Sequence, residues 1–162
     1  MWRFVKVPKA VAMLAFLLPW MTVSCSNTKV AEATGWELML GRIRPVVEMA
    51  SRPSTGHLNL YFIVAVTLIS IGLILAMLPR KYPRIVLGTS LVAMAMVWAG
   101  ANQYSSERIA AGAAKEAGDF SAVAASVIHV EWRLGYWLAL GSLGAAAVIA
   151  ILAMIERAPA AR

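Results

Sequence analysis

Residues 58–78 read LNLYFIVAVTLISIGLILAML, and this stretch decides the fold class of the chain. It runs for 21 residues without Asp, Glu, Lys, Arg or His. A helix of about 20 residues is long enough to cross the hydrocarbon core of a bilayer. Because backbone N–H and C=O groups find no water in that core, a single apolar segment that crosses it must be helical. The stretch therefore predicts a transmembrane helix.

Three further runs have the same apolar character, at residues 10–24, 85–101 and 134–155. The last run is long enough to span a bilayer, and 85–101 is short but adequate. The run at 10–24 is too short unless the residues before it extend the helix, with Lys6 and Lys9 reaching the headgroups. With 60% hydrophobic and 14% charged residues, the 162-residue chain has too little polar sequence to cover four buried helices in water. We therefore expect a single domain over residues 1–162, an all-α integral membrane protein built as a four-helix transmembrane bundle.

The basic residues predict the orientation of the bundle. Eight of the fifteen Lys and Arg residues lie in the two tails and in the short hairpin 79–84, while seven are spread over the longer segments 25–57 and 102–133. Short segments dense in Lys and Arg stay in the cytoplasm. We expect both termini and the hairpin to be cytoplasmic, and the two long segments to be outer loops, in a bacterial inner membrane. The net charge of +7 then favours contact with the lipid bilayer and not with nucleic acid.

Five tryptophans fall near the predicted outer ends of the helices or in the first outer loop. Indole rings favour the headgroup level of a membrane. We therefore predict that the following residues anchor the protein at the interface: Trp20, Trp36, Trp98, Trp132 and Trp137.

The only cysteine, Cys25, has two interpretations. It could end the first transmembrane helix, or it could become the acylated first residue after a lipoprotein signal is removed. The basic start, the apolar run and the small residues before Cys25 suit such a signal, but the leucine that usually opens the cleavage motif is missing. We favour the uncleaved chain with four spans. The alternative is a lipid-anchored chain with three spans.

The two outer loops contain signs of local structure. Thr34 and Glu37 have the spacing of a capping box, and an apolar stripe follows them as far as Pro45. This pattern predicts a short amphipathic helix that ends at Pro45. Residues 29–33 and 127–132 alternate between apolar and polar side chains, which predicts two strands that pair as a small two-stranded sheet.

The sequence contains none of the common catalytic motifs, so we predict that the chain is not an enzyme. His57 and His129 are weak candidates for a cofactor site. Both lie near the predicted outer interface and not within apolar helices at matching depth. We therefore predict no cofactor and no metal.

Small residues recur on the predicted spans, and they allow membrane helices to approach closely. The candidates for helix packing are Gly72, Gly88, Gly141, Gly144 and Ala145. We hypothesise a non-enzymatic accessory or assembly subunit of a bacterial inner-membrane complex, which acts through helix packing and an outer cap. Its partners would be other integral membrane subunits or further copies of itself. One alternative is the lipid-anchored envelope protein with a signalling or stress role. The other is an oligomeric pore or cofactor-carrying subunit of a respiratory or photosynthetic complex.

Overall fold

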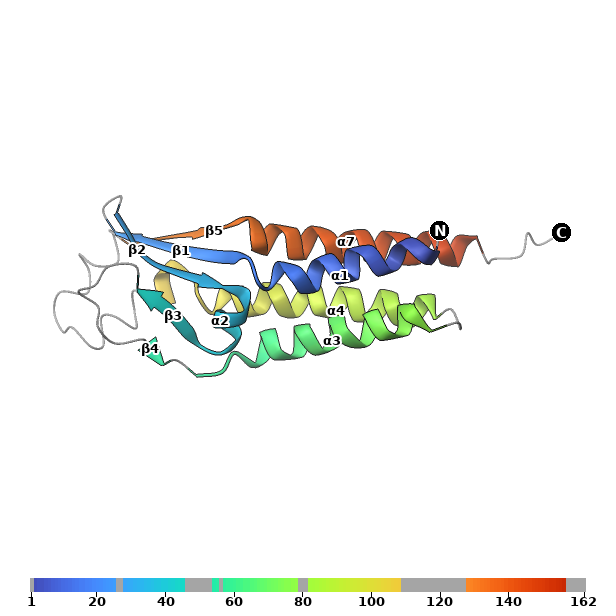
Figure 1. Ribbon diagram of the computed structural model, residues 1–162, viewed down its shortest axis with the longest axis horizontal. Coiled ribbons are helices and arrows are strands. Elements are labelled where there is room, and N and C mark those ends of the chain that lie inside the picture. The colour runs from blue at the N-terminus through green and yellow to red at the C-terminus, as the bar shows by residue number, and fades with distance from the viewer. Residues whose placement is uncertain are drawn as a thin grey trace.

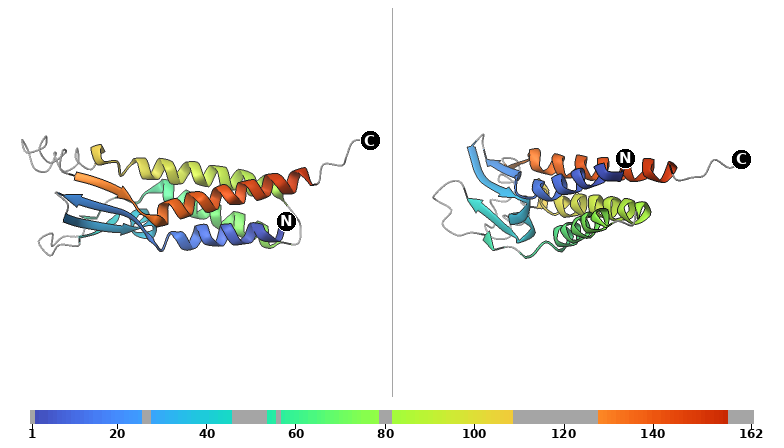
Figure 2. Two further views of the ribbon diagram at one scale, coloured as in Figure 1. Left: turned by 90° about the horizontal axis from the view of Figure 1, so that it is seen from above. Right: turned by 45° about the vertical axis from the view of Figure 1, so that its right-hand side comes forward.

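The computed structural model describes residues 2–25, 28–45, 54–55, 57–78, 82–108 and 128–156. Four helices lie side by side, and a small antiparallel sheet continues from one end of the bundle (Figure 1). We call this the sheet end. At the opposite end lie the 3-10 helix η1 (Trp2–Val5) and the last turn of α7 (Leu134–Ile155), as Figure 2 also shows. The protein therefore has an elongated helical part and a compact cap.

Three helices are long and apolar enough to cross a membrane: α3 (Leu60–Met77), α4 (Pro83–Asn102) and α7. They confirm the helices predicted from the runs at 58–78, 85–101 and 134–155. The α3 helix begins at Leu60 because the Asn59 side chain accepts hydrogen bonds from the first free backbone N–H groups. The chain thus has the helices expected of a multi-pass membrane protein.

The helix predicted over residues 10–24 is wrong in its second half. Helix α1 covers Lys6–Ala15, and strand β1 covers Pro19–Cys25. Proline has no N–H to donate and disfavours a helical residue before it, so the helix stops short of Pro19. A helix of ten residues is about 15 Å long, about half the thickness of a bilayer core. The described helices therefore include three that could span a membrane by themselves, and α1 is not one of them.

Strand β1 also changes the predicted sheet. The strands are β1, β2 (Thr28–Thr34), β3 (Arg42–Pro45), β4 (Ser54–Thr55) and β5 (Ile128–Trp132), in the order β4-β3-β2-β1-β5. The strands predicted at 29–33 and 127–132 are present as β2 and β5, although Val127 lies outside the described residues. Their predicted pairing is wrong, because β1 lies between them and pairs with both. The sequence prediction placed residues 19–24 in a helix. It therefore lacked the strand that lies between β2 and β5.

The short helix in the first loop is α2 (Gly35–Met39), and its capping box is present as predicted. It ends earlier than expected, at Leu40, because Gly41 turns the chain with a φ of 66°. Pro45, the predicted end of this helix, instead ends β3. The described part of this loop therefore contains β2, α2, β3 and β4, which together form much of the cap.

The core at the sheet end is aromatic and centres on Trp20. Its ring is fully buried and lies 4.4 Å from Phe16, 5.4 Å from Phe62 and 5.9 Å from Tyr136, measured between ring centroids. Its indole N–H donates to the carbonyl of Ala15 at 2.6 Å. The prediction of Trp20 as an interface anchor is wrong, because the protein itself encloses the ring. Trp20 joins the cap to the bundle.

Candidate functional site

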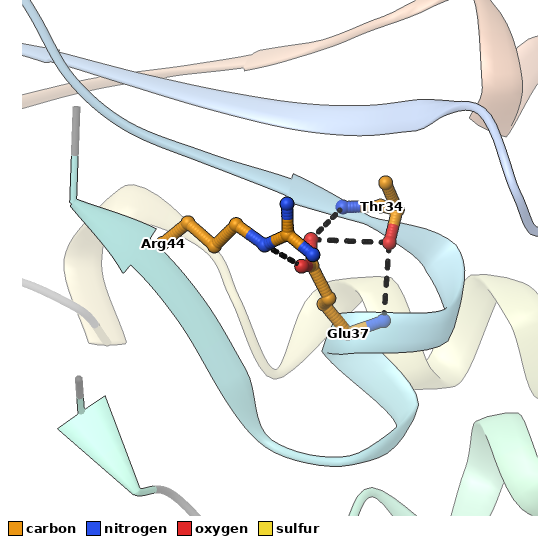
Figure 3. A network of polar contacts seen from close by, with 3 residues as sticks. All are labelled: Thr34, Glu37 and Arg44. Carbon is orange, nitrogen blue, oxygen red and sulfur yellow. Dashed lines mark hydrogen bonds and ion pairs between the residues drawn. The ribbon is translucent and has the colours of Figure 1, made fainter.

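The cap is held together by a polar network that Figure 3 shows. The Glu37 carboxylate accepts hydrogen bonds from the Thr34 backbone N–H at 3.0 Å and from the Thr34 hydroxyl at 3.1 Å. In return, the Thr34 oxygen accepts from the Glu37 N–H at 3.2 Å. Arg44 on β3 forms an ion pair with the same carboxylate (Figure 3). Glu37 is thus engaged on both oxygens in joining β2, α2 and β3, and it is not a free general base.

Further hydrogen bonds fix the cap onto the helices. The Asn59 N–H donates to the Met39 carbonyl at 3.0 Å, and the Tyr104 hydroxyl donates to the Leu38 carbonyl at 2.9 Å. At the start of α7, the Arg133 N–H donates to the carbonyl of Trp20 on β1 at 2.7 Å. These contacts tie α2 and β1 to the ends of three helices. The cap and the bundle are therefore one continuous structure.

The sequence candidates for ligand binding do not converge. His57 is exposed just before α3, and His129 is exposed on β5, where its carbonyl accepts a hydrogen bond from Ser24 at 3.4 Å. Across the described ranges, no group of three or more His, Cys, Asp or Glu residues could hold a metal ion. Neither histidine has a described partner of the kind that a haem or metal site requires.

Cys25 ends β1, with Thr28 opposite it on β2 and Ile128 opposite it on β5. Cleavage before Cys25 would remove α1 and all the other residues of the strand that lies between β2 and β5. It would also remove Trp20 from the aromatic core. A chain cleaved at this point would therefore lack part of the sheet and part of the aromatic core.

The predicted packing residues fall into two groups. Gly72 is buried within the bundle, and a Cβ atom there would lie 2.7 Å from the Lys9 ammonium nitrogen. At Gly88, Gly141 and Gly144 a Cβ atom would meet nothing within 4 Å, and Ala145 is exposed. Of the five predicted packing residues, only Gly72 therefore lies at a tight helix contact.

Gly141 and Ala145 lie in an open apolar groove between the start of the chain and α7. The groove has a volume of about 490 Å³. Its lining comes from two elements far apart in sequence: Phe4, Val7, Pro8 and Val11 on the N-terminal side, and Trp137, Leu138, Gly141, Ser142, Ala145 and Ile149 on α7. Almost none of the lining surface is polar. No described side chain of the bundle thus fills this groove.

The remaining predicted anchors differ in exposure. Trp98 is 60% exposed and Trp137 is 61% exposed, and both lie on helices that could span a membrane. Trp36 on α2 is exposed, and Trp132 at the end of β5 is half-buried. These four rings can reach lipid headgroups or a partner, whereas Trp20 cannot.

Lys9 is a polar residue whose position the sequence analysis missed. It was expected to reach the headgroups, but it is fully buried, and its ammonium nitrogen lies 3.5 Å from the Thr89 hydroxyl oxygen. A signal for this burial exists in the sequence, because Val5, Lys9 and Ala12 share one face at helical spacing. Both of the ion pairs in the described part of the chain lie in the cap and involve other residues.

No protein-family model, curated protein or solved structure matches this chain. The chain has three helices long and apolar enough to span a membrane and a small sheet at one end of the bundle, so only its own residues bear on its function.

Proposed function

We propose that this chain is a non-enzymatic accessory or assembly subunit of a bacterial inner-membrane complex. It acts by packing a transmembrane helix of another subunit against α7, while the cap contributes an outer surface. The observation that carries this proposal is the apolar groove with its small residues exposed at Gly141 and Ala145.

The proposed orientation follows from charge. Arg84 is exposed at the start of α4, and Lys6 is partly exposed on α1, both at the end opposite the sheet. In the sequence, further basic residues fall in the hairpin 79–84 and in the two tails. Dense Lys and Arg residues favour the cytoplasm, so the sheet would face outward and both termini inward.

A helix is the occupant that fits the groove. Gly141 and Ala145 are four residues apart and therefore lie on one face of α7, one turn from each other. Small residues at this spacing let two helix backbones approach closely in lipid, where no hydrophobic force drives helices together. The apolar lining provides no partner for a polar ligand.

The test is recovery of partners from native membranes with a matched pair of variants. Gly141→Leu fills the groove, whereas Gly88→Leu places the same side chain on an equally open site of α4. At both positions the added Cβ atom would meet no described atom within 4 Å, so both variants should fold. We expect Gly141→Leu to lower the recovery of specific membrane partners by about tenfold, a loss of about 1.4 kcal/mol, and Gly88→Leu to retain them.

Two outcomes would contradict the proposed function. One is purification of the unaltered protein in mild detergent as a monomer without partners. The other is equal recovery of the same partners by Gly141→Leu and by the unaltered protein.

A further inference from the structure

Helix α1 and the residues just before it have two faces with different roles. Phe4, Val7, Pro8 and Val11 line the groove on one side. Val5, Lys9, Ala12 and Ala15 are fully buried on the other. Lys9 therefore sits on the face that holds α1 to the bundle, among residues that are otherwise apolar.

The surroundings of Lys9 contain one described polar contact. The Thr89 hydroxyl oxygen lies 3.5 Å from the ammonium nitrogen, and this hydroxyl itself donates to the Val86 carbonyl at 3.0 Å. On α3, Gly72 makes room for the end of the lysine side chain, because a Cβ atom would lie 2.7 Å from the nitrogen. The site thus provides a hydroxyl oxygen that can accept a hydrogen bond from the Lys9 amine, and room beside Gly72 for the end of the lysine side chain.

The other described titratable groups on the neighbouring elements, including Tyr82 before α4, make no hydrogen bond or ion pair with Lys9. Tyr61 lies in the first turn of α3, eleven residues before Gly72, and Tyr136 packs against Trp20 at the sheet end. Arg84 on α4 is exposed. Among the described side chains, none of these groups, nor Lys6 on α1 or Glu156 after α7, forms an ion pair or hydrogen bond with Lys9. Within the described ranges, no carboxylate forms an ion pair with Lys9.

A buried charge without a counter-ion is unfavourable by several kcal/mol. Lysine has two ways to avoid this cost: it can lose its proton, or its long stem can carry the charge to the membrane surface. The second route requires α1 to move, because the side chain is enclosed in its present position.

We propose that the proton on Lys9 controls how firmly η1 and α1 are held against α3 and α7. The neutral amine closes the bundle, whereas protonation from water gives an ammonium that weakens the contact. Since the docked position favours the neutral form, docking becomes stronger as pH rises and weaker as pH falls. The groove-lining face belongs to the same segment, so the proton also adjusts the shape of the groove. This inference requires no partner protein and stands apart from the proposed function.

The experiment measures docking by cross-linking. Val5 of η1 and Ala150 of α7 are fully buried in one cluster. Both are replaced by cysteine in a Cys25→Ser background, and the full chain is reconstituted in lipid vesicles. The fraction joined directly by a disulfide bond, which needs no reagent between the two buried positions, is then followed with a soluble oxidant as reagent from about pH 7 to about pH 10.5. The parent is compared with Lys9→Met, which cannot titrate, and with Lys6→Met, which removes a lysine one turn earlier on the same helix.

We expect the ratio of docked to loosened protein in the parent to rise by up to about tenfold per pH unit, the limit for one proton. Lys6→Met should follow the parent, and Lys9→Met should remain highly cross-linked with no pH dependence beyond that of the reagent. The same profile in Lys9→Met and the parent would overturn the proposal, as would a parent whose profile matches the reagent alone. If circular dichroism shows that Lys9→Met does not fold, Lys9→Gln gives the same comparison with a polar uncharged side chain.

Discussion

Replacement of Trp20 tests how the cap and the bundle are joined. The ring packs against Phe16 from α1's end, Phe62 from α3 and Tyr136 from α7. The indole N–H also donates to the carbonyl of Ala15 at 2.6 Å. One side chain thus connects three helices with β1. Its loss should therefore lower the free energy of unfolding of the whole protein.

The size of the effect follows from burial. Truncation of a fully buried aromatic ring to alanine typically destabilises a protein by about 3–5 kcal/mol. We therefore expect Trp20→Ala to lower the free energy of unfolding by about 4 kcal/mol. Trp20→Phe keeps a ring but loses the hydrogen bond to Ala15, at a cost of about 1–2 kcal/mol. Trp137 is 61% exposed and is the matched control, with an expected change of about 0.5 kcal/mol or less for Trp137→Phe.

The assay is equilibrium unfolding in mixed micelles of a mild detergent and sodium dodecyl sulfate, followed by far-ultraviolet circular dichroism. This signal comes from the backbone and is not lost when a tryptophan is removed. The expected order of stability is the unaltered protein, Trp137→Phe, Trp20→Phe and then Trp20→Ala. Equal destabilisation by Trp137→Phe and Trp20→Phe would refute the assignment of Trp20 to the core.

Two further changes test the interior of the bundle and the cap. Gly72→Ala places a Cβ atom 2.7 Å from the Lys9 nitrogen and 2.9 Å from the Thr89 hydroxyl oxygen, so we expect a loss of about 1 kcal/mol in the same unfolding assay. Gly88→Ala, which meets nothing within 4 Å, should be neutral or stabilising, and a larger loss there than at Gly72 would be inconsistent with the packing. Glu37→Gln weakens the capping box and removes the ion pair with Arg44, and should cost about 1 kcal/mol. Hydrogen exchange of the amides in Gly35–Met39 should then become faster, and unchanged exchange would show that the network does not hold α2.

The three long helices were predictable because their signal does not depend on tertiary contacts. A run of about 20 residues without charge has few structural options in lipid. The capping box was equally accessible, since Thr34 and Glu37 interact across three residues of the same chain. Local patterns of this kind predict both that a helix is present and roughly where it begins.

The run at residues 10–24 could not be resolved by hydropathy alone. A ten-residue helix followed by an apolar strand has the same composition as a short transmembrane helix. Pro19 and the β-branched pair Thr22 and Val23 were the available signals for a strand. The position of β1 in the sheet depends on β2 and β5, and β5 lies more than a hundred residues away.

The candidate sites were least predictable, because the role of each residue depends on whether its face of the helix is covered by another helix. Gly72 and Gly141 look alike in sequence, yet one is enclosed and the other is open. Lys9 reads as a membrane-surface lysine beside a basic tail, and its burial becomes visible only once α1 is known to pack through that face. Trp20 and Trp137 differ for the same reason.

Thiol labelling of intact cells tests whether the bundle spans the inner membrane with its sheet on the outer side. In a Cys25→Ser background, cysteine replaces either Lys29, exposed on β2, or Arg84, exposed at the start of α4. A membrane-impermeant maleimide should label the cysteine at position 29 in cells whose outer membrane has been opened. It should reach position 84 only after the inner membrane is disrupted. Labelling of position 84 from outside, or equal labelling of both positions while the inner membrane is intact, would be inconsistent with this orientation.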